Sequence, residues 1–155
     1  MKTVLLEKSL ITFRMDDQLH ALPVSKVKRI FRIVEITAAP GAHPALMGFI
    51  NIQGQVVPVV NTRALFGIRM REIDLSDQLI LVCASRRLAA LWVDGGTDII
   101  YLDSIPIMEE NTSAAKATVL QTASGLIYLH EVDLELQFLE EIDAKEFKHC
   151  IQSEK

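Results

Sequence analysis

The sequence predicts an all-β protein with a single helix near its C-terminal end. Short apolar stretches of strand length recur along the chain, and residues typical of turns separate them. Many short hairpins with few long helices are typical of small barrels or a sandwich. At 155 residues the chain fits one domain, with two small lobes sharing a core over roughly residues 9–70 and 75–150.

The apolar content predicts a buried core and no membrane span. Half of the residues are apolar and 23% are charged, which is ordinary for a globular protein. The longest uninterrupted apolar runs, Leu79–Ala84 and Leu88–Val93, are too short to cross a bilayer. The first ten residues lack the apolar stretch of a signal peptide. Two cysteines, Cys83 and Cys150, are too few for a disulfide framework. We therefore expect a cytoplasmic protein without direct membrane insertion.

Charge is distributed unevenly along the chain. Residues 1–71 contain ten basic and four acidic residues, whereas residues 72–155 contain six and sixteen, which together give the net charge of −4. A basic half beside an acidic half suits a scaffold that docks charged proteins in a fixed orientation. A solvated surface with a chance asymmetry is the alternative.

The N-terminal third predicts a hairpin and a third strand. Ser9–Met15 alternates apolar and polar residues, as a half-buried strand does, and Leu19–Pro23 is the return strand. A short 3₁₀ turn is expected over Val24–Val27. Lys28–Ile36 is rich in β-branched and aromatic residues and predicts a strand, and Thr37–Pro44 is a proline-containing loop.

The next stretch predicts a tight hairpin followed by a short helix. Strands at Phe49–Ile52 and Val56–Val60 flank Gln53-Gly54, a turn in which glycine accepts positive φ. Pro58 lacks a backbone donor and therefore favours an edge or a bulge. Asn61-Thr62 can cap a helix over Arg63–Phe66 that ends at Gly67.

The middle of the chain predicts a central hairpin. Leu79–Ser85 and Leu88–Val93 flank a turn at Arg86-Arg87, and their nearly continuous apolar character predicts strands buried on both faces. A polar connector over Ile68–Gln78 precedes them. Asp94-Gly95-Gly96 breaks the second strand, and Asp98–Leu102 resumes it.

The last third predicts a loop, one more hairpin and the helix. Ser104–Ala115 is expected to be the loop, and Thr118–Thr122 and Leu126–His130 the two strands. Asp133 is the expected N-cap. The apolar face is Val132, Leu136, Leu139 and Ile142, joined by Leu134 and Phe138, and the opposite face is acidic, with Glu140, Glu141, Asp143 and Glu146. This pattern favours a helix docked on its own domain over a partner-binding helix.

The sequence predicts neither catalysis nor a cofactor. His20, His43, His130 and His149 lack the spacing of a zinc site, and no serine or cysteine lies in a nucleophile elbow. Gly95-Gly96 lacks the lysine and hydroxyl residue of a phosphate loop. The basic cluster Lys26, Lys28, Arg29 and Arg32 stands in an acidic chain with 6% aromatic residues, which disfavours nucleic acid as a partner.

Nine residues between Pro44 and Leu65 resemble the core signature of the CheW-like domain family of bacterial chemotaxis. They are Pro44, Gly48, Asn51, Ile52, Gly54, Pro58, Val59, Arg63 and Leu65. Ala90–Asp94 takes the place of a second family signature, and the resemblance extends over roughly Ser9 to Leu139. It implies two small five-stranded β-barrels side by side, together with the C-terminal helix.

The resemblance also implies a non-enzymatic adaptor that couples chemoreceptors to a CheA-type histidine kinase. The regulatory domain of the kinase and the cytoplasmic tip of a methyl-accepting receptor would be its partners. The positions that match this role are Val27, Arg29, Ile30, Met47, Gly48, Gln53, Gly54 and Val93. Core packing is the alternative for Val27, Ile30 and Val93, and backbone conformation is the alternative for the two glycines.

Three positions depart from the family pattern. Arg29 stands where the family usually has Glu, Gln53 where it has Arg, and Asn61 where it has Asp. The first two changes predict an altered receptor preference, because a charge reversal at a docking rim changes partner choice. Two other functions stay open: a coupler in another two-component pathway, such as surface motility or second-messenger control, and a β-barrel that binds a small ligand.

Overall fold

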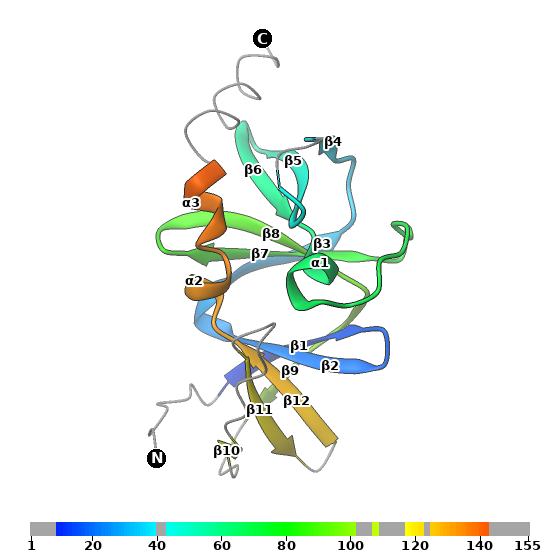
Figure 1. Ribbon diagram of the computed structural model, residues 1–155, viewed down its shortest axis with the longest axis vertical. Helices are drawn as coiled ribbons and strands as arrows, with labels where there is room; N and C mark the ends of the chain where they lie inside the picture. Colours follow the sequence, from blue (N-terminus) through cyan, green and yellow to red (C-terminus); the bar gives the residue numbers. More distant parts are fainter. Residues whose placement is uncertain (1–8, 40–42, 102–106, 109–116, 123–124, 143–155) are drawn as a thin grey trace.

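The computed structural model describes residues 9–39, 43–101, 107–108, 117–122 and 125–142, which form two β-sheets and a few short helices (Figure 1). Their bounds, in chain order, are β1 Ser9–Met15, β2 Gln18–Pro23, η1 Val24–Lys26 (a 3₁₀ turn), β3 Val27–Arg32, β4 Thr37–Ala38, β5 Leu46–Ile52, β6 Gln55–Val60, α1 Thr62–Phe66, β7 Gln78–Ala84, β8 Arg87–Val93, β9 Gly95–Tyr101, β10 Ile107–Met108, β11 Ala117–Thr122, β12 Gly125–His130, α2 Val132–Glu135 and α3 Phe138–Ile142.

Each sheet has six strands within the described residues. The first sheet has the order β10-β11-β12-β2-β1-β9, and the second has the order β3-β7-β8-β6-β5-β4. In each, a two-residue strand, β10 or β4, lies at one edge beyond five longer strands. The predicted all-β class with helical structure at the C-terminal side is confirmed.

The two sheets do not divide at residue 70, where the sequence placed the boundary between lobes. β1 and β2 join β9 to β12 in the first sheet, and the second sheet contains β3 to β8. The β1–β9 pair and the parallel β2–β12 pair bring together strands from opposite ends of the chain. Alternating polarity identifies such strands but does not say which distant strand will pair with them.

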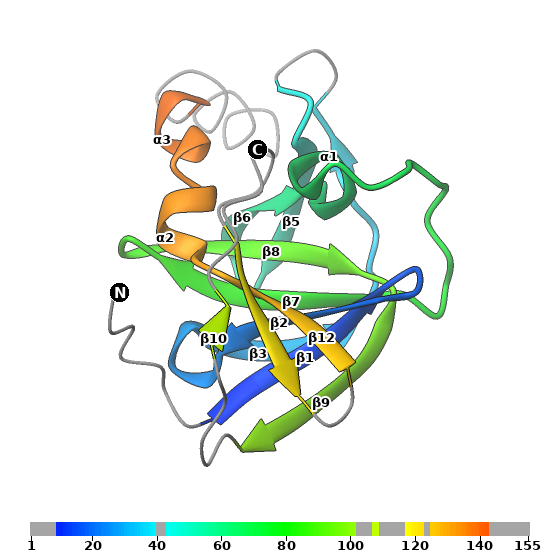
Figure 2. The same cartoon turned by 60° about the horizontal axis from the view of Figure 1, so that its bottom comes forward.

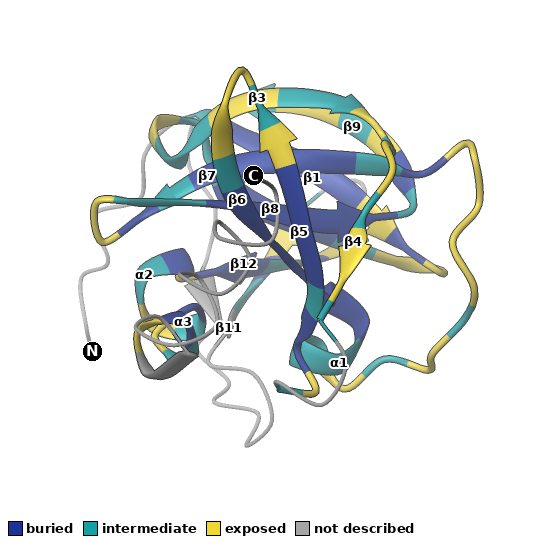
Figure 3. Ribbon diagram, turned by 90° about the horizontal axis from the view of Figure 1, so that it is seen from above, coloured by how far each residue is buried: buried dark blue, intermediate teal, exposed yellow. Residues whose placement is uncertain are grey.

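Three apolar clusters form the core. The first lies between the sheets and includes Phe13, Met15, Val82, Leu91 and Val93. The second lies on the other face of the second sheet and includes Val57, Leu79, Leu81 and Trp92. The third belongs to the first sheet. β7 and β8 therefore bury both faces, which explains their nearly continuous apolar sequence and confirms their predicted central position (Figure 3).

The hairpin β5–β6 and helix α1 form as their local sequence predicts. Gln53 and Gly54 have φ of 51° and 86°, and the Asn51 side chain accepts a hydrogen bond from the Gly54 N–H at 2.8 Å. Asn61 caps α1 by accepting from the Ala64 N–H at 3.2 Å, and Gly67 ends the helix in the left-handed conformation.

Pro58 lies in an internal strand, whereas its missing donor predicted an edge or a bulge. A register shift in the β5–β6 pair lies next to it, between Leu46 and Gly48, which face Val60 and Val59. β6 pairs with β5 on one side and with β8 on the other. The pairing with β8 is recorded only for Val59 and Val60, so Pro58 precedes the stretch where a donor toward β8 would be needed.

Several boundaries differ from the prediction. β3 ends at Arg32 rather than Ile36, and Asp94 alone separates β8 from β9. The single predicted helix is two short ones, and Glu131 is the N-cap residue of α2 instead of Asp133. The Asp133 carboxylate instead accepts from Lys26 and from the backbone N–H of Ser85. β12 leads into α2, and α3 follows beside the second sheet (Figure 2).

The predicted apolar helix face is confirmed for Val132, Leu136 and Leu139, which are buried in the cluster between the sheets. Leu134 is exposed instead, and Phe138 is partly buried. The side chains of Glu141 and Ile142, residues 143–155 including Asp143, Glu146, His149 and Cys150, and most of the predicted loop 104–115 lie outside what is described. No helix among the described residues is long and apolar enough to span a membrane.

Candidate partner-binding surface

The turn between β5 and β6 presents two of the candidate residues to solvent. Gln53 and Gly54 are both exposed, and the Asn51 side chain fixes the turn through its bond to the Gly54 N–H. Because Gln53 itself has a positive φ of 51°, the backbone holds this polar side chain at the tip of the hairpin. The turn is therefore an exposed, uncharged projection whose backbone is held by a side-chain hydrogen bond.

Strand β3 presents a third candidate, Arg29. Its guanidinium carbon lies 5.6 Å from the centre of the Phe31 ring, and the side chain is exposed. Among the described strands β3 pairs only with β7, so it is an edge strand of the second sheet. Lys28 and Arg32 are exposed on the same strand. The edge is therefore strongly basic.

The other five candidates contribute mainly to packing. Val27 and Ile30 are partly buried against the cluster between the sheets, and Met47 is partly buried against the second-sheet cluster. Val93 is fully buried and offers no side chain to a partner. A Cβ on Gly48 would lie 2.0 Å from the Thr37 carbonyl oxygen, so the close approach of β4 requires glycine there.

The structure does not gather the exposed candidates into one patch along the second sheet. β3 stands at one end of the strand order, and β5 and β6 stand toward the other, with β7 and β8 between them. Arg29 on one side and Gln53-Gly54 on the other are thus separate features of the surface.

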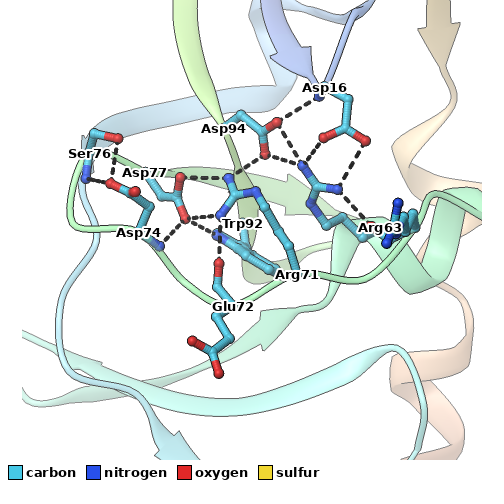
Figure 4. A network of polar contacts seen from close by, with 10 residues as sticks. Asp16, Arg63, Arg71, Glu72, Asp74, Ser76, Asp77, Trp92 and Asp94 are labelled. Carbon is cyan, nitrogen blue, oxygen red and sulfur yellow. Dashed lines mark hydrogen bonds and ion pairs between the residues drawn. The ribbon is translucent and has the colours of Figure 1, made fainter.

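A partly buried charged network, which the sequence did not predict, joins the turn before β2, helix α1 and the link from β8 to β9. Arg63 is 1% exposed and donates to Asp16 at 2.6 Å and to Asp94 at 2.7 Å. Arg71 donates to Asp94 at 2.6 Å and to Asp77 at 2.7 Å. Figure 4 shows the two guanidinium groups on either side of the Asp94 carboxylate.

Trp92 completes this network from the core side. Its indole N–H donates to Asp77 at 2.8 Å, and the guanidinium carbon of Arg71 lies 5.2 Å from the ring centre. Burial opposes ionisation of Asp77, but donors on Arg71, Asp74 and Trp92 outweigh burial and hold its pKa below the usual range. We call the set Asp16, Arg63, Arg71, Asp77, Trp92 and Asp94 the charged network.

The charged network is a structural joint. Asp16 belongs to the first sheet's β1–β2 turn, Arg63 follows the second sheet's β6, and Asp94 lies where the chain passes from the second sheet to the first. Arg63 also donates to the Arg69 carbonyl at 2.7 Å and so holds the exposed loop after α1 (Figure 3). Arg63 and Asp94 both stood in matched signature positions, but nothing in the sequence said that they would meet.

Two of the histidines considered as metal ligands do come together. His20 and His130 lie 2.6 Å apart, ring nitrogen to ring nitrogen, although 110 positions separate them in the chain. Among the described residues no group of three or more His, Cys, Asp or Glu side chains is placed to hold a metal ion. The pair belongs instead to a series of hydrogen bonds that also includes Gln18 and Glu135.

Comparison with known proteins identifies the family. A family model for the CheW-like domain matches residues 9–130. The chemotaxis protein CheW of Bacillus subtilis is 30% identical over 113 residues, 72% of this chain and 71% of that protein. CheW of Thermotoga maritima is 26% identical over 94% of this chain and 99% of that protein. The scaffolding protein TtCheW of Thermoanaerobacter tengcongensis has the same fold, with a TM-score of 0.75, 22% identity and coverage of 85% of this chain and 89% of that one. This chain belongs to the CheW-like domain family.

Proposed function

We propose that this chain is a chemotaxis coupling protein, a non-enzymatic scaffold that joins a CheA-type histidine kinase to chemoreceptors in the cytoplasm. The observation that supports this is the length of the match: relatives named for chemotaxis align over most of their own length, and the family model spans both sheets. An adaptor of this kind acts by holding partners in a fixed geometry, so rigid surfaces matter and reactive side chains do not.

The proposed partners are the regulatory domain of the kinase and the cytoplasmic tip of the receptor. Arg29, Gln53 and Gly54 are the exposed candidates for contact. Val27 and Ile30 are partly buried apolar residues of β3, the strand of Arg29, and Met47 is one of β5, the strand that leads to the Gln53-Gly54 turn. An apolar patch with a polar rim is typical of protein interfaces. Gly48 and Val93 support the surface from inside.

Titration calorimetry of the full chain against the regulatory domain of its cognate kinase tests the proposal. We expect saturable binding. Gln53→Ala should weaken it if the hairpin tip is in contact, and Gln137→Ala, an exposed glutamine in the turn after α2, is the matched control. Absence of binding at concentrations on the order of hundreds of micromolar would contradict the proposed coupling role.

The basic edge at β3 supports a more specific proposal about the receptor. Lys28, Arg29 and Arg32 are all exposed there, and no ion pair is recorded for any of the three within the described residues. A partner with acidic residues at the facing positions would be favoured, and one with basic residues would be rejected, because like charges at an interface are penalised. We propose a receptor tip that is acidic where it meets β3.

The test compares the wild type with the Arg29→Glu, Gln53→Arg double variant for binding to an ordinary receptor tip. The double variant restores the charges that are usual in the family and should bind more tightly, mainly through a faster association rate. Equal affinity for the two proteins would mean that neither residue sets receptor preference. That outcome leaves the coupling role itself intact.

A further inference from the structure

Four polar side chains form one line of hydrogen bonds from the surface into the interior of the protein. Gln18 Oε1 lies 3.2 Å from His20 Nε2, His20 Nδ1 lies 2.6 Å from His130 Nε2, and His130 Nδ1 lies 2.8 Å from Glu135 Oε1. Gln18 is exposed, His20 and His130 are 3% and 2% exposed, and the Glu135 side chain is 8% exposed. We call this line the proton line.

Three elements supply the proton line. Gln18 and His20 belong to β2, His130 ends β12, and Glu135 ends α2. The bond from Glu135 to His130 therefore ties the first C-terminal helix back to the strand that precedes it. Val132, Leu136 and Leu139 bury the rest of this segment between the sheets.

Aromatic rings enclose the two imidazoles. The Phe66 ring of α1 stacks on His130 with centroids 3.8 Å apart, and Phe13 of β1 and Tyr128 of β12 stack on His20 at 5.6 and 5.2 Å. Burial in these surroundings lowers the pKa of both histidines to about 3. Near neutral pH both rings are uncharged, and each holds one proton.

The number of protons then follows from the geometry. If the Gln18 oxygen accepts from His20 Nε2, the His20 Nδ1 must accept from His130 Nε2. His130 Nδ1 is left as an acceptor, and the third bond forms only if Glu135 donates. With Gln18 in this orientation the line therefore holds Glu135 in its neutral, protonated form, whereas with the Gln18 amide rotated every donor is reversed and His130 donates to an ionised Glu135. Burial, together with the negative charge of Glu131, raises the pKa of Glu135 to about 8, in agreement with this assignment.

Loss of one proton has a defined route. The Glu135 proton passes to His130 Nδ1, the His130 Nε2 proton passes to His20 Nδ1, and the His20 Nε2 proton leaves to solvent beside Gln18. The exposed Gln18 amide must then rotate so that its N–H donates to His20 Nε2. One proton leaves in total, and a negative charge remains on the buried Glu135 carboxylate.

The surroundings do little to stabilise that charge. The uncharged His130 is the hydrogen-bond partner recorded for Glu135 among the described residues, and the negative charge of Glu131 repels the Glu135 carboxylate. Asp94 is the charged group that acts on His20. The nearby cation Lys26 is paired with Asp133 at 2.9 Å. Phe13, Phe66 and Tyr128, from β1, α1 and β12, contribute rings rather than charges.

We propose that the proton line is a latch that holds α2 against β12 most firmly while Glu135 is protonated. After the proton is lost the hydrogen bonds re-form with reversed donors, but the Glu135 carboxylate, 8% exposed, then faces an uncharged His130, and this buried, unpaired charge loosens the helix.

The sign of the effect follows from linkage. Glu135 has a higher pKa in the folded than in the unfolded chain, so its contribution to stability declines as pH rises toward about 8 and is then lost. The contribution of the two histidines to folding stability falls only as pH drops below about 6.5, because their pKa values are lower in the folded than in the unfolded chain. Their effect therefore lies at lower pH than that of Glu135.

Urea unfolding of the full chain between pH 6.5 and 9 tests the latch. Glu135→Gln keeps a donor toward His130 but cannot ionise, and Glu140→Gln, at an exposed position on α3, is the matched control. Over this range we expect the unfolding constant of the wild type to rise by roughly thirtyfold relative to Glu135→Gln. The control should follow the wild type. Equal pH dependence in the wild type and Glu135→Gln would overturn the proposal.

Two further measurements locate the effect. At pH 8.5, amide hydrogen exchange in residues 132–139 should be slower in Glu135→Gln than in the wild type, and equal exchange would contradict a loosened helix. Nitrogen chemical shifts of the wild-type histidines need no variant. We expect His20 and His130 to change tautomer together, with a common midpoint near the Glu135 pKa of about 8. Unchanged tautomers up to pH 9 would overturn the proton line.

Discussion

The protein has two polar centres within the fold, the charged network and the proton line. Each must satisfy polar groups that are wholly or partly removed from water, and they do so by different means. The charged network places two guanidinium groups against three carboxylates, so every charge has a partner of opposite sign. The proton line contains no fixed charge near neutral pH and depends on one proton shared along neutral groups. Both join elements that are distant in sequence, but only the proton line lies in a pH range where it can change state.

The difference follows from the side chains. An arginine stays protonated at any pH that a protein meets, and hydrogen bonds to Asp16 and Asp94 raise the pKa of Arg63 further against the effect of burial. A buried carboxyl with only imidazole beside it ionises much later than an exposed one. The network therefore suits a permanent joint between the sheets, and the line suits an adjustable attachment of α2.

Removing Arg63 is the strongest way to break the permanent joint. Arg63→Met should cost about 3 kcal/mol, near the low end for a broken buried ion pair, because Asp94 keeps Arg71 and the Asp16 side chain is 49% exposed. Glu135→Gln, measured at pH 6.5, should cost less than about 1 kcal/mol because its amide still donates to His130. Urea unfolding followed by circular dichroism measures both.

If Arg63→Met lowers the free energy of unfolding no more than Glu135→Gln does at pH 6.5, the charged network is not the stronger of the two attachments. Met fills much of the space of the arginine stem, so a large loss reports the charge and its bonds rather than a cavity. Arg69→Met, at an exposed position in the loop after α1, is the matched control and should leave stability nearly unchanged.

The predictability of the molecule depends on sequence distance. Gln53-Gly54, Asn61 and Gly67 act on their immediate neighbours, so the hairpin and helix α1 could be placed correctly. The apolar runs of β7 and β8 revealed burial on both faces. Asp133 looked like an N-cap because cap preference is local, but in the fold Lys26 and the Ser85 N–H take its carboxylate.

Both polar centres were beyond sequence reasoning for the same physical reason. Arg63 meets Asp16 across 47 positions, and His20 meets His130 across 110. No periodicity relates such residues, since their proximity follows from how strands pair in the sheets. A polar or charged residue flanked by apolar ones, as His20 is by Leu19 and Ala21, was the only available signal, and it did not name a partner.

Trp92 allows a graded test of the charged network. Trp92→Phe keeps an aromatic ring in the core but removes the indole donor to Asp77 at 2.8 Å. We expect a loss of about 2 kcal/mol, from one hydrogen bond to a charged group and a smaller ring, while Arg71 still holds the Asp77 carboxylate. Because the chain has one tryptophan, unfolding of this variant must be followed by circular dichroism.

A comparison of the Trp92→Phe loss in two backgrounds shows whether the network acts as one unit. Trp92→Phe in the Arg63→Met background should cost less than in the wild type if Asp94 and Arg71 transmit the change between the two sites. Additive losses would mean that the Arg63 and Asp77 ends are independent, and the network would then be two adjacent ion-pair clusters.

The smallest effect is expected at the ion pair that attaches the N-terminal turn of α2. Lys26 donates to Asp133 at 2.9 Å, but the two side chains are 37% and 45% exposed, so water screens their attraction. Lys26→Ala should cost less than about 1 kcal/mol, and the loss should shrink further in high salt. Asp133→Ala should cost more than Lys26→Ala, because it also deprives the Ser85 N–H of its acceptor at 3.0 Å. If Lys26→Ala proves as costly as Arg63→Met, then exposed and buried charges contribute alike here, and burial does not set the contrast between these attachments.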